Sequence, residues 1–505
     1  MQTDAGHARR SPPLILSLLL GAVPVALLFL VVRHLGGGLI DDAFIFCRYA
    51  ANIAAGQGAV FNSGERVEGF TSPAHALVTA ALVTMGIEAP VAAWWVSMGA
   101  AALSLVALCL FRGAPGLCAA LLAIAAAPFA LWASTGMDSS LFALAITISV
   151  LMVEADLDRW RRGESPSPIS KRTWFAAGSA VIVRPEGILL LMIVIAIAPR
   201  HLTSIRGVGG PLIGVAPVIL LTLLRGAYYG DWVPNTFRAK VGGGGVDLWA
   251  RGLDYLADSG IALAPLVLLA SAHAWRVLRR RETAAVGTWI TVALAAGIVF
   301  EGGDHFPMHR LAVPFIPLLC LASSRLIWSL DVPGRARSVA AAAAVCLTAT
   351  CSLQPAMLER FRLELTLART WDSMGREMLR QLGSGHSIAL TNAGAIPFRT
   401  GWHTIDMIGL LDRHIAARPV RLGHGYTGHE KYDSAYVLNR EPDFILIHTW
   451  IWRSIVSGDE ALRRVSGDAN LDMSHAPRFR STYYLRWLAM PNGFVALYER
   501  RRGGP

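Results

Sequence analysis

Long apolar segments, separated by short polar ones, fill the first 353 residues of the chain. A helix needs about 20 apolar residues to cross a bilayer, so these segments predict helices that span or enter a membrane. They lie near residues 14–33, 74–87, 91–111, 115–132, 139–154, 174–184, 187–199, 211–225, 260–276, 284–300, 311–328 and 337–353. The pattern predicts a polytopic α-helical membrane protein.

Basic residues cluster between the apolar segments, at 155–172, 276–283 and 331–337. Cytoplasmic loops carry such an excess of Lys and Arg, which places these clusters on the cytoplasmic side. The short run 74–87 then cannot cross without inverting everything after it, so we expect an interfacial or re-entrant helix there. About eleven spans remain, with the amino terminus in the cytoplasm and the carboxyl end outside.

The apolar segment at 174–199 is interrupted by Arg184-Pro185-Glu186-Gly187. It is either one span with a buried charge pair or two half-spans that meet at a turn. Pro and Gly both interrupt helices, and they favour the turn.

The composition changes near residue 354, after which no run is long enough to cross a membrane. The sequence therefore predicts a transmembrane domain of residues 1–353, with a juxtamembrane loop at 34–90 on its outer face. An extracytoplasmic α/β domain of residues 354–505 is expected to follow. Helix-like stretches in this second domain alternate with strand-like segments at 387–390, 444–447 and 494–498.

Composition agrees with a membrane protein, because 54% of the residues are hydrophobic, only 16% are charged, and the mean hydropathy is +0.46. The formal net charge of +11 comes from short clusters between apolar runs, which indicates membrane topology and not nucleic-acid binding.

The six cysteines show no CxxC spacing, so neither a disulfide framework nor a zinc site is expected. No phosphate-binding glycine motif opens a helix, which argues against ATP or a soluble sugar nucleotide as substrate.

The predicted topology gathers the polar motifs on the outer face of the membrane. This co-location predicts a functional site at that face. The motifs are Asp41 to Thr71, Thr135 to Ser140, Arg184 to Gly187, Arg225 to Ser259, and Glu301 to Arg310.

Two adjacent acids, Asp41 and Asp42, open a predicted amphipathic helix that ends at Gly56. One Asp satisfies the need for a helix cap, and the helix dipole favours a negative charge there. The second carboxylate opens the alternative of a catalytic base or a metal ligand.

Further carboxylates in the outer segments each allow a structural and a functional interpretation. The loop 61–73 carries Glu65, Arg66 and Glu68, and is either a solvated turn or part of the site. Asp138 precedes the next inward span, where a helix N-cap is the simpler interpretation and a site role the alternative.

The cationic candidates on this face are Arg184, Arg238, Lys240, His309 and Arg310. Each alone could be a membrane anchor, but together they would bind an anion, and the arginine fork matches phosphate in particular. Acids and histidines between positions 301 and 310 lie in a Gly- and Pro-containing loop. We therefore predict no metal site there, and a divalent cation stays the minor alternative.

The order of these motifs resembles the GT-C superfamily of membrane glycosyltransferases. The nearest likeness is to the mycobacterial terminal β-(1→2)-arabinofuranosyltransferase family and its bacterial relatives. Asp138 departs from the Glu that relatives carry, and the likeness of the carboxyl-terminal domain is patchy. The matching residues are Asp41 to Ile45, Arg48 to Ala50, Gly56 to Gly58, Phe61-Asn62, Gly64 to Pro73, Thr135 to Asp138, Arg184 to Gly187, Tyr228 to Asp231, Pro234 to Phe237, Lys240, Gly302 to Asp304, His309-Arg310 and Ile405 to Leu410.

The resemblance implies an inverting transfer of a sugar, with arabinofuranose favoured, from a polyprenyl-phosphate donor to a cell-envelope glycan or glycoconjugate. Asp41, slightly preferred over Asp42, would act as the general base. The enzyme would sit in the bacterial inner membrane with its site outside. No cofactor is assigned, and a divalent cation stays the minor alternative. The residues expected to hold the donor are Arg48, Glu65, Arg66, Glu68, Asp138, Arg184, Glu186, Asn235, Lys240, Asp304, His309 and Arg310.

Two other classes of protein stay open. A transporter or flippase of lipid-linked saccharides would place charges near the bilayer midplane and show internal repeats, whereas these motifs gather at one face. A membrane-anchored carbohydrate-binding protein would leave the acidic pair unexplained.

Overall fold

The computed structural model describes residues 14–198, 205–280, 282 and 285–501 of the chain. Its first part is helical. The helices are α1 (Leu14–Leu35), α2 (Asp41–Ala54), α3 (Pro73–Thr84), α4 (Ala89–Ala125), α5 (Ala127–Trp132), α6 (Ser139–Arg161), α7 (Lys171–Val183), α8 (Gly187–Ile197), α9 (Ile205–Tyr229), α10 (Asn235–Lys240), α11 (Val246–Ala262), α12 (Ala264–Arg280), α13 (Ala285–Glu301), the 3-10 helix η2 (Arg310–Phe315), α14 (Ile316–Trp328) and α15 (Gly334–Ser352).

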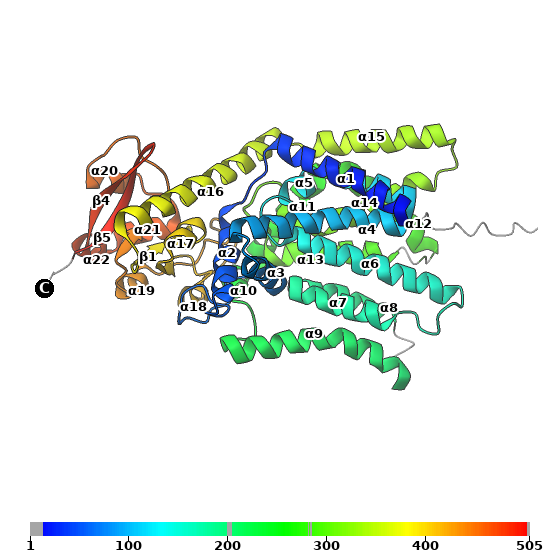
Figure 1. The fold of residues 1–505 in the computed structure, drawn as a ribbon, viewed down its shortest axis with the longest axis horizontal. Helices are drawn as coiled ribbons and strands as arrows, with labels where there is room; N and C mark the ends of the chain where they lie inside the picture. Colours follow the sequence, from blue (N-terminus) through cyan, green and yellow to red (C-terminus); the bar gives the residue numbers. More distant parts are fainter. Residues whose placement is uncertain (1–13, 199–204, 281, 283–284, 502–505) are drawn as a thin grey trace, which may run out of the picture.

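The long helices lie side by side along the long axis of the molecule, with α4 between α1 and α6, and α7 between α6 and α9 (Figure 1). Small and branched apolar side chains fill the space between them. Leu105, Leu108, Phe142 and Ile146 are among the residues that solvent does not reach. Residues that face outward are also apolar, such as Leu220, which is the pattern of a helix surrounded by lipid.

Among the residues that the structure describes, four helices are long and apolar enough to cross a membrane, or up to six if each of two bent helix pairs counts as one span. The coarse prediction of a polytopic helical membrane protein stands, whereas the count of about eleven spans is not confirmed. One reason is that α4 contains two predicted spans, since Gly113 breaks it with a φ of +56°. Another is that α8 has 11 residues, or about 17 Å of helix, against about 30 Å of bilayer core.

The interrupted segment around Arg184 forms two helices joined by a turn. Helix α7 ends at Val183, α8 begins at Gly187, and the two helices pack against each other. A Cβ atom on Gly187 would lie 2.3 Å from the carbonyl carbon of Ala180, so only glycine permits this close approach. The turn favoured by the sequence is therefore present, and it carries the two charged residues at its tip.

The predicted short helix at the acidic pair is α2, with both acids in its first turn. Helix α3, which lies in the short run 74–87, packs against α2 and α4. Both helices lie near the end of the bundle that faces the sheet (Figure 1).

The second part of the chain begins with the long helix α16 and contains a five-stranded sheet with the order β2-β1-β3-β5-β4. Strands β1, β2 and β3 are parallel, while β5 runs antiparallel to β3 and β4. Strands occur at all three predicted segments, and β2 and β4 had not been predicted. The elements are α16 (Pro355–Leu382), β1 (Ser387–Leu390), α17 (Ala395–Thr400), β2 (His403–Asp406), α18 (Arg413–Ala416), α19 (Ser434–Asn439), β3 (Phe444–Leu446), α20 (Gly458–Arg463), α21 (Asp468–His475), α22 (Pro477–Thr482), β4 (Tyr483–Met490) and β5 (Gly493–Arg500).

Candidate active site

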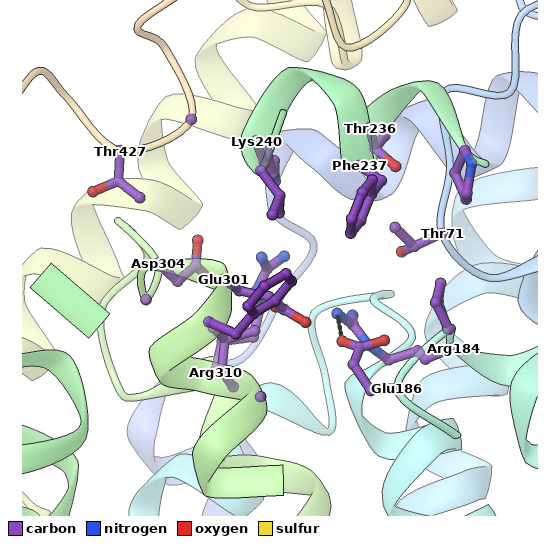
Figure 2. A pocket seen from close by; sticks show the side chains of 18 of the residues that line it. Thr71, Arg184, Glu186, Thr236, Phe237, Lys240, Glu301, Asp304, Arg310 and Thr427 are labelled. Carbon is purple, nitrogen blue, oxygen red and sulfur yellow. Dashed lines mark hydrogen bonds and ion pairs between the residues drawn. The ribbon is translucent and has the colours of Figure 1, made fainter. Parts of the chain in front are cut away.

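A cavity of about 610 Å³ opens where the helix bundle meets the second part of the chain (Figure 2). Its walls come from the α7–α8 turn, α8, α10, α13 and the loop between α13 and η2, and Thr427 and Gly428 of the second part close one side. The cavity is large enough for a drug-sized ligand. Its two ends differ in chemistry.

One end of the cavity is apolar. Ile188 and Leu189 of α8 contribute to it, together with Ala293, Ala296 and Phe300 of α13. Helix α8 consists of apolar residues and glycine, so any face it turns to the cavity offers hydrocarbon. This end can hold an apolar chain.

The other end is cationic, and Arg184 is fixed within it by two carboxylates. Its Nη2 and Nε atoms lie 2.5 and 2.9 Å from Glu186 Oε1, and Nη1 donates at 3.2 Å to Asp138. Asp138 occupies the N-cap position of α6 but makes no capping hydrogen bond, so the simpler N-cap interpretation is wrong. Its second contact is the Thr71 hydroxyl, which donates at 3.2 Å.

Arg310 and Lys240 complete the cationic end from the opposite side (Figure 2). Arg310 Nε lies 2.6 Å from Asp304 Oδ2, and its guanidinium carbon lies 4.9 Å from the centre of the Phe306 ring. Lys240, at the end of α10, forms no ion pair with any residue that the structure describes. Its ammonium is therefore the cation with the least committed charge.

Glu301 also lines this end, together with Glu186 and Asp304. The four cations of the lining, which include Arg251, outnumber these three acids. The cavity therefore combines an apolar chain site with an anion site.

The two acids of α2 have different surroundings. Both carboxylate oxygens of Asp41 are occupied, because they accept hydrogen bonds from the backbone N–H groups of Gly394 and Ala395 at 3.1 and 2.8 Å. Burial raises the pKa of Asp41 to about 7. Asp42 is half-buried, and its charge acts on Arg310 and His429. Asp42 does not line the cavity, but its charge acts on the cationic end through Arg310, whereas Asp41 holds the start of α17.

Arg48, expected at the donor site, lies outside the cavity. Its guanidinium donates to the carbonyl oxygens of Phe61, Pro397 and Trp402, each at 2.8 Å. Burial lowers its pKa to about 10. This cage of carbonyl groups ties the first loop to the second part of the chain, and it leaves no free donor face for a substrate phosphate.

The loop that follows α2 also uses its charges for internal contacts. Glu68 forms a buried ion pair with Arg225 of α9, at 2.5 and 3.0 Å. Glu65 pairs with Arg440 at 2.8 Å, and the guanidinium carbon of Arg66 lies 4.8 Å from the centre of the Tyr228 ring. None of the three lines the cavity.

Three more candidates lie behind or beside the cavity wall. The amide of Asn235 donates at 2.9 Å to the carbonyl oxygens of Gly409 and Leu410, which positions α10. His309 Nδ1 shares a hydrogen bond of 3.1 Å with the Ser259 hydroxyl. Arg238 pairs with Asp231 near the surface.

Several cavity residues had not been selected as site residues from the sequence, although Thr236, Phe237 and Arg251 lie within the outer polar motif Arg225 to Ser259. Thr236 and Phe237 of α10 point into the cavity, and Thr427 reaches it from the second part of the chain (Figure 2). Arg251 lines it as well, with Nη1 2.9 Å from Glu430. Arg251 carried a usable signal, because it is a cation within that motif, whereas Thr236, Phe237 and Thr427 are uncharged.

No group of three His, Cys, Asp or Glu side chains with a metal-binding arrangement occurs among residues 14–198, 205–280, 282 and 285–501. Two acids of the cavity lining, Glu186 and Asp304, are each paired with an arginine. The charge available for an anionic ligand is that of the arginines and Lys240.

Three comparisons with known proteins bear on this site. Residues 360–497 match a family model described as a domain of unknown function (DUF8728). The chain is 31% identical over 274 residues to the terminal β-(1→2)-arabinofuranosyltransferase of Mycobacterium tuberculosis, and 27% identical over 335 residues to the one of Corynebacterium glutamicum. These matches cover 50% and 55% of this chain but 43% and 46% of the relatives, so the chain spans less than half of their length.

The fold is also found in crystal structures of ArnT from Cupriavidus metallidurans, in the apo state and bound to undecaprenyl phosphate. The TM-scores are 0.54 and 0.56, with 14% sequence identity. Each alignment covers 95% of this chain and 97% of ArnT. The chain thus shares the fold of ArnT, and its likeness to the arabinofuranosyltransferases confirms the resemblance that its motifs indicate.

Proposed function

We propose that this protein is an inverting glycosyltransferase of the bacterial inner membrane that moves an arabinofuranosyl group from a polyprenyl phosphate to a cell-envelope glycan. The observation that carries the proposal is the cavity with one apolar and one cationic end. A polyprenyl phosphate has the matching shape, a long hydrocarbon chain that ends in an anion. The undecaprenyl phosphate bound by ArnT has this chemistry, and the arabinofuranosyltransferase names of the relatives favour the sugar.

The lipid chain would lie along α8 and α13, and the phosphate would meet Lys240, Arg184 and Arg310. Arg184 and Arg310 are held in place by carboxylates, so they provide a fixed electrostatic environment. Lys240 is the uncommitted cation, and it would neutralise the charge that develops on the phosphate as the sugar leaves.

Asp42 is the better candidate for the general base, because both oxygens of Asp41 accept backbone hydrogen bonds. It would take the proton from an acceptor hydroxyl as the hydroxyl oxygen attacks the anomeric carbon. The bond between that carbon and the phosphate oxygen breaks in the same step. One displacement inverts the anomeric centre, and the phosphate leaves as an anion that needs no proton.

The site would lie on the outer side of the membrane, as the basic loops predict, with the amino terminus in the cytoplasm. Residues 354–505 would then be extracytoplasmic. This placement brings the acceptor glycan to the same face as the cavity.

The test is a transfer assay in liposomes with a labelled polyprenyl-phosphate arabinofuranose and an arabinose oligosaccharide. Lys240→Met should lower kcat/KM by about 10- to 150-fold, the range for a lost hydrogen bond to a charged group. Lys171→Met is the matched control, because Lys171 is exposed at the far end of α7 and should leave transfer unchanged. Equal rates for both variants would contradict the phosphate site.

The same liposomes separate the proposal from a flippase and test the sugar. Movement of the donor lipid between leaflets without transfer would favour the flippase. Donors that carry another pentose or a hexose should be transferred more slowly than arabinofuranose, and a faster hexose donor would refute the assigned sugar.

A further inference from the structure

A second polar cavity, of about 520 Å³, lies in the part of the chain that carries the sheet. Three separate segments wall it: Arg418, which follows α18; α19 with the residues before it; and the junction of α21 and α22. It is separate from the cavity of Figure 2 and has no role in the transfer step. Its chemistry can be read from its side chains.

Charges in this cavity balance, because its lining holds the two arginines Arg418 and Arg478 and the two acids Asp433 and Asp472. Arg418 pairs with Asp433 at 2.6 Å, and Arg478 Nη1 donates to Asn439 Oδ1 at 2.5 Å. Such a lining does not select for an anion or a cation. Its further polar groups include the amide nitrogen of the exposed Asn439 and the His475 ring, and such donors and acceptors can bind hydroxyl groups.

One wall also provides a flat apolar surface. Tyr432 is half-buried, packs against the main hydrophobic core, and lines the cavity with the part that remains accessible. An aromatic ring beside balanced polar groups suits the ring of a sugar, which has an apolar face and a rim of hydroxyl groups.

A short segment connects this cavity to the transfer site. Gly428 lines the first cavity and Tyr432 the second, and four residues of extended chain reach at most about 14 Å. Lys431 lies between them, buried, and its ammonium donates to the carbonyl oxygens of Arg238 at 2.8 Å and Ala416 at 2.7 Å. This lysine fixes α10, which carries Lys240, relative to α18, which adjoins the second cavity.

We infer that the second cavity binds the neutral oligosaccharide of the acceptor, a few sugar residues away from the hydroxyl that receives the new sugar. The inference rests on the proposed function for the identity of the acceptor. It explains why the two cavities share one rigid segment, since a glycan held in one must present its end to the other.

The test compares acceptors of different length on the full chain in nanodiscs. Asn439→Ala and His475→Ala should each raise KM about five-fold for an arabinose hexasaccharide, which corresponds to one lost neutral hydrogen bond. The kcat value, and the KM for a disaccharide that is too short to reach the cavity, should not change. Asn492→Ala is the matched control, because Asn492 is exposed in the β4–β5 turn and does not line the cavity.

Binding of the fluorescently labelled hexasaccharide, measured without any donor, tests the cavity independently of transfer. The wild type should bind the hexasaccharide more tightly than the disaccharide, and the two variants should lose this difference. Variants that keep the full difference, or an anionic oligosaccharide that binds more tightly than the neutral one, would overturn the inference. Binding that depends on the cavity in a protein that transfers no sugar would support the cavity and refute the proposed function.

Discussion

Replacing each acid of the pair at the start of α2 tests the assignment of the general base. Asp42→Asn removes a base but keeps the size of the side chain. Loss of a general base typically costs about 10²- to 10⁴-fold in rate, or about 2.7 to 5.4 kcal/mol of activation free energy. We therefore expect Asp42→Asn to lower kcat by this factor with an unchanged melting temperature, because its carboxylate accepts no backbone hydrogen bond within the described residues.

Asp41 provides the matched control, because it is the adjacent residue of the same type. Asp41→Ala removes the acceptor of two buried N–H groups, those of Gly394 and Ala395, which lie 3.1 and 2.8 Å from its carboxylate. Each orphaned group costs about 1–3 kcal/mol, so this variant should lose about 2–6 kcal/mol of folding free energy. Asp41→Asn keeps one acceptor oxygen and should retain activity within a few fold.

The assay pairs initial transfer rates in liposomes with thermal unfolding of the detergent-solubilised protein, followed by tryptophan fluorescence. The reasoning is refuted if Asp41→Asn loses kcat by 100-fold or more at an unchanged melting temperature while Asp42→Asn stays active. That result would return the role of base to Asp41, the residue that the sequence alone slightly favours.

Four other outcomes follow from the contacts. Glu68→Gln breaks a buried ion pair with Arg225 and should cost about 3–5 kcal/mol in chemical unfolding, whereas Glu68→Leu combined with Arg225→Met should recover much of the loss. Arg48→Met should lower the melting temperature without raising KM for the donor; a raised KM at unchanged stability would instead place Arg48 at the substrate. Burial raises the pKa of Asp406 to about 7, so its contribution to stability is complete below about pH 4 and disappears as the pH rises through 7; Asp406→Asn should flatten that slope in melting curves between pH 4 and 8. A chelator should leave transfer unchanged, because arginines and a lysine supply the charge at the cavity, and inhibition that Mg²⁺ reverses would contradict this.

Sequence patterns located the polar end of the cavity well, because membrane topology is encoded locally. Basic loops and apolar runs decide which motifs share a face, and Arg184, Lys240 and Arg310 all line one cavity. A cation is costly to place near a bilayer, so each one indicates a functional site even when its partners are unknown. The turn between α7 and α8 was also predictable from local sequence, because Pro185 and Gly187 interrupt a helix.

The hydrogen-bond partner of each charged side chain could not be predicted, because the partners come from segments that are far apart in the chain. Asp138 precedes a helix, so capping was the local expectation, but its partner Arg184 arrives from the next helix pair. Arg48 was assigned to the donor because it stands in the acidic motif, whereas residues more than 340 positions later fill its hydrogen bonds. Thr427 carries no charge and could not have been selected by any pattern.

The division at residue 354 marks a change of composition, whereas the packing continues across it. Phe361, Leu365 and Ile408 belong to the same buried cluster as the side chains of the helix bundle. Asp41 and Arg48, both buried, find their hydrogen-bond partners in the second part of the chain. Without those partners, two buried charged groups would have no compensation, which is costly. Asp41 and Arg48 of α2 therefore dock the second part of the chain, while the adjacent Asp42 acts electrostatically on Arg310 of the cavity.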